Sequence, residues 1–160
     1  MNAIWKAAGL AVWFAGVSGS GLAAETTYTK DIKPLVEAKC AACHGAASPT
    51  LAEFLKDEKK FAAAMKGPRF DSYADLLMLV GWTDTGAIMR RLDDGKNALA
   101  GGKPGNMYQY LGGTEEERQQ NLQTFKAWVG PDGWNLNRFK ARGNVPGVSK
   151  EQLEKILVKY

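Results

Sequence analysis

Both cysteines and the only histidine of this 160-residue chain lie within five consecutive positions, Cys40-Ala41-Ala42-Cys43-His44. Cys-x-x-Cys-His is the pentapeptide to which haem is attached covalently, because each thiol can add across one haem vinyl group. On a helix, two intervening residues set the sulfurs about one turn apart, as the vinyl groups require. The adjacent His44 is then held under the iron as an axial ligand. Any fold of this chain must therefore accommodate a haem at this peptide.

Other uses of these three residues agree less well with the sequence. A structural zinc site takes four Cys or His ligands, and the chain contains only three. A thioredoxin-like Cys-x-x-Cys is expected within a βαβ unit, which this sequence does not predict. A disulfide that closes so short a loop constrains the unfolded chain little. We therefore predict one covalent haem c per chain, attached through Cys40 and Cys43.

The second axial ligand of the iron must come from another residue type. With no second histidine, the choices are Met, Lys, water or an open position. Three methionines, Met65, Met78 and Met89, fall in segments predicted to be helical, where methionine commonly fills a core. Met107 lies in a glycine-rich loop, from which its thioether can reach the iron without breaking helical hydrogen bonds. We predict Met107 as the ligand opposite His44, with Met89 as the next candidate.

The distribution of apolar residues predicts an all-α fold, because no segment alternates between apolar and polar positions with hairpin turns. Helical spacing and caps predict helices over residues of about 31–43, 51–65, 73–80, 85–92, 114–129 and 149–159. Two of them begin with a capping box, Thr114 with Glu117 and Ser149 with Gln152. The glycine-rich residues 100–113 and the residues 131–148 are predicted to be irregular.

The first 24 residues have the three-part layout of a secretory signal. A weakly positive start precedes the apolar run 7–17, and the small residues 18–24 end just before Glu25. We predict that residues 1–24 are a signal peptide and that the rest of the chain is exported to the periplasm. Retention of this segment as a membrane anchor is the alternative, since eighteen uncharged residues are close to the minimum for a span.

In chain order, the haem peptide followed by Gly45, then Gly67-Pro68, Gly105-Asn106-Met107 and a capped helix bearing Trp128 resemble class I (monohaem) c-type cytochromes. The resemblance covers about Thr27 to Gly130. It implies a cytochrome c-like helical domain around one covalent haem over residues 25–130. Residues 131–160 depart from a minimal member of that family, and we expect them to form a C-terminal extension with a terminal helix.

The resemblance also implies contacts around the haem. In this family the first and last helices cross beside the haem, which would bring Val36 or Lys39 near Phe125 and Trp128. A proline carbonyl accepts the N–H of the axial histidine. Pro68 matches the Gly-Pro pattern for this role, and Pro49 is the alternative.

Several cationic and aromatic side chains are candidates to line the haem pocket and bind its propionates: Arg69, Trp82, Arg90, Arg91 and Tyr108. Arg90 has an alternative partner in Asp94, four residues later. A second cationic group, comprising Lys56, Lys59, Lys60 and Lys66, could steer docking to an acidic protein. Because Glu53, Asp57 and Glu58 are interspersed with these lysines, we expect an ordinary solvated helix face. Trp134 and Phe139 are expected to fold back on the core.

The net charge of +4 offers little support for nucleic-acid binding, because two haem propionates would bring the chain close to neutral. The sequence predicts a periplasmic electron carrier rather than an enzyme, with redox proteins as donor and acceptor. No distal histidine is present to handle peroxide or bound oxygen, which disfavours a gas-binding or peroxidase-like protein with an open sixth position. A haem subunit of a larger oxidoreductase is the main alternative. The membrane is a partner only if residues 1–24 are retained.

Overall fold

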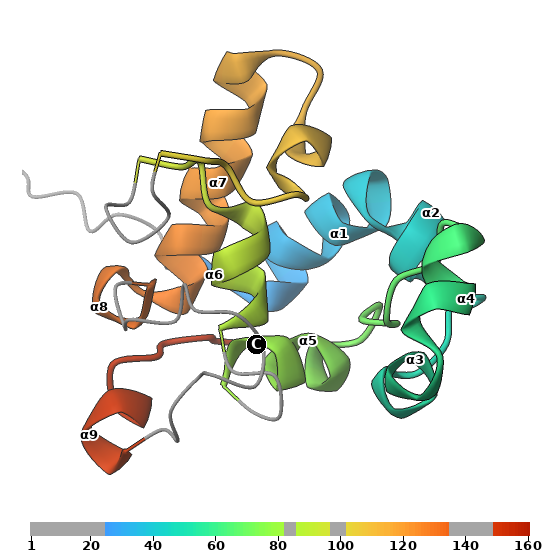
Figure 1. Ribbon diagram of the computed structural model, residues 1–160. Helices are drawn as coiled ribbons and strands as arrows, with labels where there is room; N and C mark the ends of the chain where they lie inside the picture. The colour runs from blue at the N-terminus through green and yellow to red at the C-terminus, as the bar shows by residue number, and fades with distance from the viewer. Residues whose placement is uncertain (1–24, 82–85, 97–101, 135–148) are drawn as a thin grey trace, which may run out of the picture.

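The computed structural model describes residues 25–81, 86–96, 102–134 and 149–160 (Figure 1). These residues form helices joined by turns and irregular connections. These residues contain no strand, so the predicted all-α fold class is confirmed. Along the chain the elements are η1 (Tyr28–Ile32), α1 (Lys33–Lys39), α2 (Ala41–His44), α3 (Leu51–Lys56), α4 (Glu58–Ala63), α5 (Tyr73–Val80), α6 (Ala87–Leu92), η3 (Tyr108–Leu111), α7 (Glu115–Val129), α8 (Pro131–Trp134) and α9 (Lys150–Leu153).

The first predicted helix is divided into η1, α1 and α2. It begins three residues earlier than expected, at Tyr28, where the Thr27 hydroxyl accepts the amide of Lys30 at 3.3 Å. Cys40, with φ −119°, separates α1 from α2, so the haem peptide forms a short turn of its own. Gly45 ends α2 in an extended conformation, and a Cβ atom there would lie 2.5 Å from the carbonyl oxygen of Ala41. A glycine is therefore needed where the chain leaves the haem peptide.

The second predicted helix is also split, into α3 and α4. Thr50 and Glu53 form a reciprocal capping box on α3, and the Asp57 carboxylate caps α4 through the amide of Lys60 at 3.1 Å. Met65 follows α4 in a left-handed conformation, with φ 54°, and its side chain is 76% exposed. The expectation that Met65 fills the core from a helix is wrong, because the chain has already turned away at Ala64. In Figure 1, α3 and α4 lie at the end of the molecule opposite α8 and α9.

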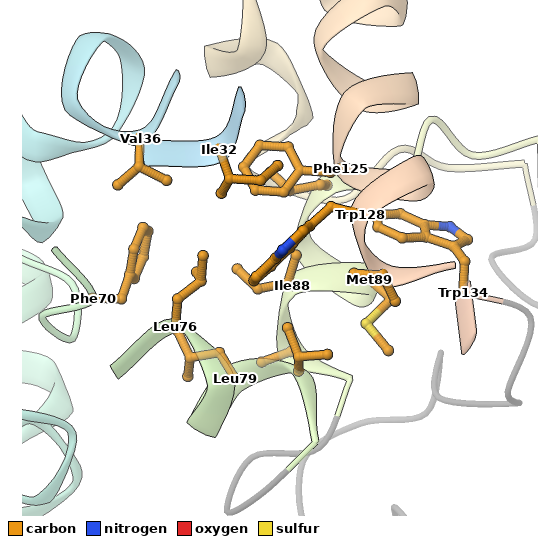
Figure 2. Close-up of a cluster of buried hydrophobic side chains, with 14 of the residues drawn as sticks. Ile32, Val36, Phe70, Leu76, Leu79, Ile88, Met89, Phe125, Trp128 and Trp134 are labelled. Atoms are coloured by element: carbon orange, nitrogen blue, oxygen red, sulfur yellow. The ribbon is translucent and has the colours of Figure 1, made fainter. Parts of the chain in front are cut away.

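The hydrophobic core lies between η1, α1, α5, α6 and α7. Figure 2 shows side chains of these helices converging around Trp128, which is fully buried together with Phe125. η1 packs directly against α7, and the ring centroids of Tyr28 and Trp128 lie 6.3 Å apart. Lys39, expected near Phe125 and Trp128, pairs instead with Glu117 in the first turn of α7. Each fully buried side chain of this size stabilises the fold by about 1.5–3 kcal/mol. Trp134, from α8, joins the same cluster, as expected.

The start of α7 differs in one contact from the predicted capping box. The Thr114 hydroxyl accepts the amide of Glu117 at 3.2 Å, as predicted. The Glu117 carboxylate does not return to Thr114; it accepts the amide of Gly113 at 2.7 Å and pairs with the Lys39 ammonium at 2.5 Å. Lys39 thereby connects α1, next to the haem peptide, to the first turn of α7.

The C-terminal residues form less helix than predicted. The Ser149–Gln152 capping box is present, but α9 ends at Leu153, and α8 is a short helix within a region expected to be irregular. The amides of Leu157 and Val158 donate to the carbonyls of Val129 and Trp128, both at 2.9 Å. These carbonyls belong to the last turn of α7 and have no partner within that helix. If the helix continued after Leu153, both amides would donate to carbonyls within that helix and could not bind the α7 carbonyls.

Among the residues described, no helix is long and apolar enough to cross a membrane. The predicted signal segment 1–24, together with Trp82 and Phe139, lies outside the described residues.

Candidate haem-attachment site

His44 is oriented by a hydrogen bond to the segment that follows α4. The amide of Gly67 donates to the carbonyl of Cys43 at 2.9 Å, and the amide of Phe70 donates to the carbonyl of His44 at 3.0 Å. These bonds place the Pro68 carbonyl oxygen 2.8 Å from His44 Nδ1. A carbonyl can only accept, so Nδ1 carries the proton and donates it, and Nε2 keeps its lone pair for a metal. The Pro49 carbonyl instead accepts the amide of Arg69 at 2.7 Å.

Two neighbouring residues, Phe70 and Gly67, restrain the plane of the same imidazole. The Phe70 ring stacks on it, with centroids 4.3 Å apart and an interplanar angle of 26°. Gly67 lies against its edge, and a Cβ atom at this position would be only 2.0 Å from His44 Cε1. Sequence reasoning missed both residues as parts of the site. The Gly-Pro pair was a signal for Gly67, whereas nothing distinguished Phe70 from other core aromatics.

The protonation states at the site suit ligation. Burial lowers the pKa of His44, and the charge of Arg91 lowers it further, while the hydrogen bond to Pro68 opposes them. The imidazole is thus neutral at neutral pH, as a ligand to iron requires. Burial, and then the neighbouring Cys43 thiol, raise the pKa of Cys40 to about 11. Both cysteines are half-buried and free, so neither is consumed in a disulfide.

Met107 lies immediately before η3, half-buried against the hydrophobic core. Its amide donates to the carbonyl of Arg91 at 2.9 Å, and the Arg91 guanidinium donates to Asn106 Oδ1 at 3.0 Å. Arg91 is also the residue whose charge lowers the pKa of His44. The loop that carries Met107 is therefore hydrogen-bonded to a residue whose charge lowers the pKa of His44.

The other predicted methionine positions differ in their surroundings. Met89 is completely buried in the core, where Figure 2 shows it among apolar side chains. Met78 is partly buried against the same core.

Arg69 and Tyr108, like Arg91, already have polar partners. The Arg69 side chain donates to the Asp71 carboxylate at 2.6 Å. The Tyr108 hydroxyl donates to Glu115 Oε1 at 2.7 Å, and burial together with this bond raises the pKa of Tyr108 to about 12. Asp94, considered as a partner of Arg90, lies 3.6 Å from the Lys96 ammonium.

Three of the four lysines considered for docking, Lys56, Lys59 and Lys60, are exposed on α3 and α4. Lys66 is half-buried, and its ammonium donates to the carbonyl of Ala42, inside the haem peptide, at 3.1 Å. The interspersed Glu53 and Asp57 serve as helix-capping residues.

These observations fit a covalently attached haem. Two free thiols stand beside a neutral histidine whose Nε2 is available, and Gly67 leaves room against the imidazole edge for this orientation. Cys40 and Cys43 would carry the porphyrin, and His44 would ligate the iron.

A family model for the PccH cytochrome c matches residues 27–160, most of the chain. The chain belongs to this cytochrome family. Among solved structures, the monoheme cytochrome PccH from Geobacter sulfurreducens is 50% identical, with a TM-score of 0.72, and the match covers 85% of this chain and 99% of that chain. A comparison with curated proteins found no match.

The chain is thus a monohaem c-type cytochrome with one covalently bound haem, as predicted from the haem peptide. The family match continues through residue 160. The C-terminal residues that the class I resemblance left unexplained therefore belong to the family's pattern, in agreement with their hydrogen bonds to α7.

Proposed function

We propose that this cytochrome is a periplasmic electron carrier whose haem iron is held between His44 and Met107. The observation that carries the proposal is the hydrogen bond from His44 Nδ1 to the Pro68 carbonyl, which leaves the Nε2 lone pair available to a metal. The haem, when attached, supplies an iron that cycles between Fe(II) and Fe(III). Donor and acceptor are other redox proteins, and export is supported by the layout of residues 1–24.

The protein residues keep the iron surroundings constant while the charge changes. Phe70 and Gly67 restrain the imidazole, and the backbone bonds of the Met107 loop restrain the second ligand. Ligands that stay in place in both oxidation states keep the structural change on electron transfer small. A thioether ligand also favours Fe(II), which raises the potential above that of a bis-histidine haem.

Replacement of the proposed second ligand tests the axial assignment. The oxidised wild-type protein should be low-spin with a weak far-red methionine-to-iron charge-transfer band, and the reduced protein should resist carbon monoxide. Met107→Ala should abolish the band, admit carbon monoxide and lower the potential, because a ligand that favours Fe(II) is lost. Met89→Ala and Met78→Ala are the controls and should retain the band. A wild-type protein that is high-spin and binds carbon monoxide at once would contradict the proposal.

The proposed location is tested on protein from a host with haem-maturation machinery. The mature chain should be found in a periplasmic extract and should begin at Ala24 or Glu25. An intact Met1 in the membrane fraction would show that the segment is retained as an anchor.

A further inference from the structure

Tyr108, the residue after Met107, is buried, with 7% of its surface exposed. Its hydroxyl donates to Glu115 Oε1 at 2.7 Å, and Gln119 Nε2 donates to the same hydroxyl oxygen at 2.7 Å. Glu115 and Gln119 lie four residues apart and therefore on one face of α7. The hydroxyl is thus used both as donor and as acceptor, and both partners belong to α7.

Gln119 extends this network to the turn that follows α6. Its Nε2 also lies 3.1 Å from Asp94 Oδ2, in hydrogen-bonding geometry. The Asp94 carboxylate in turn accepts the amide of Lys96 at 3.1 Å. Three segments therefore meet through the Tyr108 hydroxyl and the Gln119 amide: η3, α7 and the turn at residues 93–96.

The residues before Tyr108 are held from the other side by backbone bonds. The amide of Gly105 donates to the carbonyl of Asp93 at 2.8 Å, and the amide of Met107 donates to the carbonyl of Arg91 at 2.9 Å. A Cβ atom at Gly105 would lie 2.3 Å from the Arg91 carbonyl oxygen, so this approach is as close as the backbone allows. Met107 consequently stands between a backbone anchor on α6 and a side-chain anchor on α7.

We propose that Tyr108 is a positioning residue that holds the Met107 loop closed, so that the Met107 sulfur stays on the iron. This inference rests on the proposed axial role of Met107. It assigns Tyr108 to the support of the ligand loop rather than to the haem propionates, because its hydroxyl is already engaged on α7. If the loop opens away from α7, the hydroxyl must leave both of its partners on that helix.

The size of the effect follows from the nature of the bond. A hydrogen bond from a hydroxyl to an ionised carboxylate is stronger than one between neutral groups. Glu115 is exposed, so water can replace the hydroxyl without leaving a buried orphan. Loss of the Tyr108–Glu115 hydrogen bond therefore acts mainly on loop opening. The population of molecules with an open loop should rise by about tenfold when the hydroxyl is removed. Binding of an external ligand through the open state should accelerate by the same factor.

The experiment uses the haem-loaded protein with Tyr108→Phe, which keeps the buried ring and removes only the hydroxyl. The matched control is Tyr110→Phe, two residues along in η3, whose side chain is 59% exposed. Two quantities are measured: the carbon monoxide association rate of the reduced protein, and the urea midpoint for loss of the far-red band compared with that for loss of far-UV helical signal. Tyr108→Phe should bind carbon monoxide about tenfold faster than wild type and lose the band before the helices unfold. Tyr110→Phe should match wild type in both.

A second pair of variants tests the same contact from α7 and covers the case in which Tyr108→Phe fails to fold. Glu115→Ala removes the acceptor, whereas Glu116→Ala removes an exposed carboxylate from the same first turn. Only Glu115→Ala should accelerate carbon monoxide binding.

The outcomes separate this inference from the proposed function. If the wild type has the band, Met107→Ala loses it, and Tyr108→Phe behaves like Tyr110→Phe, the ligand assignment holds and the inference is wrong. If the band and the helical signal of Tyr108→Phe shift together, Tyr108 supports the fold in general, and the inference is also wrong. If Met107→Ala retains the band, the proposed ligation fails and the inference fails with it.

Discussion

His44 acquires its orientation from three neighbours that come from one short stretch, residues 67–70. Pro68 binds Nδ1, Phe70 covers one face of the ring, and Gly67 leaves room at its edge. Only Pro68 acts through a hydrogen bond. Phe70 and Gly67 act through shape, so the orientation of the imidazole depends on the absence of a side chain at Gly67 as well as on the hydrogen bond to Pro68.

Gly67→Ala should therefore disturb the orientation of His44. The added methyl group would overlap the imidazole, which is tethered through its own peptide and cannot withdraw. We expect a loss of about 2 kcal/mol in the free energy of unfolding, a lower yield of haem-loaded protein and partial high-spin character. Gly81→Ala is the control, because nothing lies within 4 Å of a Cβ atom there. Equal visible spectra and equal urea midpoints for the two variants would contradict this role of Gly67.

A second prediction at this scale concerns the buried carboxyl of Asp93, which is 1% exposed. Burial raises the pKa of Asp93, and the amide of Gly95 and the charge of Lys126 only partly oppose this. The folded chain thus binds more protons than the unfolded chain above pH 3.8, so this group's contribution to stability falls as the pH rises. Asp93→Asn should raise the melting temperature at pH 7, and its advantage should shrink toward pH 3.8.

The neighbouring carboxyl provides a control of opposite sign. Burial alone would raise the pKa of Asp94, but hydrogen bonds from Gln119 and Lys96 and the charges of nearby lysines outweigh it, and the pKa is lowered. Asp94→Asn should therefore lower the melting temperature at pH 7, and its deficit should shrink in acid. A change of the same sign for both variants would contradict the burial argument for Asp93.

Covalent haem attachment through Cys40 and Cys43 could be predicted from the sequence, because the haem pentapeptide contains the chain's only two cysteines and the other uses of these residues agree less well. The Gly67-Pro68 pair was a signal for this segment, but the shape roles of Gly67 and Phe70 could not be predicted, because they arise only when residues 67–70 return to α2. Tyr108 was identified as a pocket candidate, but its partner depends on the position of α7, which no local pattern specifies.

The bounds of individual helices also depend partly on local and partly on long-range interactions. α5 has the predicted bounds, since Ser72 caps it and Gly81 follows it. The divided first and second helices were predicted as continuous, because periodicity does not register a break at Cys40 or Asp57. At Asp57 the carboxylate caps a new helix, and this local bond competes with continuation of α3.

The Thr114 cap should make a measurable contribution to α7. Thr114→Ala removes the hydroxyl that accepts the amide of Glu117, and we expect a loss of about 1 kcal/mol in the free energy of unfolding. Thr124, in the middle of the same helix, donates to the carbonyl of Gln120. That carbonyl also accepts a backbone amide within the helix. Thr124→Ala should be close to neutral, because alanine has the higher helix propensity. Urea denaturation followed by far-UV circular dichroism measures both; an equal loss would assign the effect to threonine generally rather than to the cap.

For the whole molecule, the sequence predicted an all-α cytochrome but treated residues 131–160 as an addition to it. In the structure, residues 158 and 159 contact η1, α5 and the end of α7. The carbonyl of Lys159 accepts both the amide of Tyr28 and the indole Nε1 of Trp128, each at 2.8 Å. The Tyr73 hydroxyl donates to the carbonyl of Val158 at 2.6 Å. These contacts join residues at least 31 positions apart, and two of the three join residues more than eighty positions apart. Helical periodicity carries no information about them.

Removal of residues 155–160 should therefore destabilise the entire domain. The truncation frees the Trp128 and Val129 carbonyls and leaves the buried Trp128 indole without its acceptor. At about 1 kcal/mol for each of these hydrogen bonds, the free energy of unfolding should fall by about 3 kcal/mol or more. Removal of Tyr160 alone keeps the Lys159 carbonyl and loses mainly the ring contacts with Tyr28 and Tyr73, at a cost of about 1 kcal/mol.

Urea denaturation of both haem-loaded proteins, followed at the haem band and in the far-UV, measures the difference. If residues 155–160 are an independent appendage, both truncations will leave the midpoint of the wild-type transition unchanged; a single transition displaced far more by the longer truncation will show that they are part of the haem-binding fold.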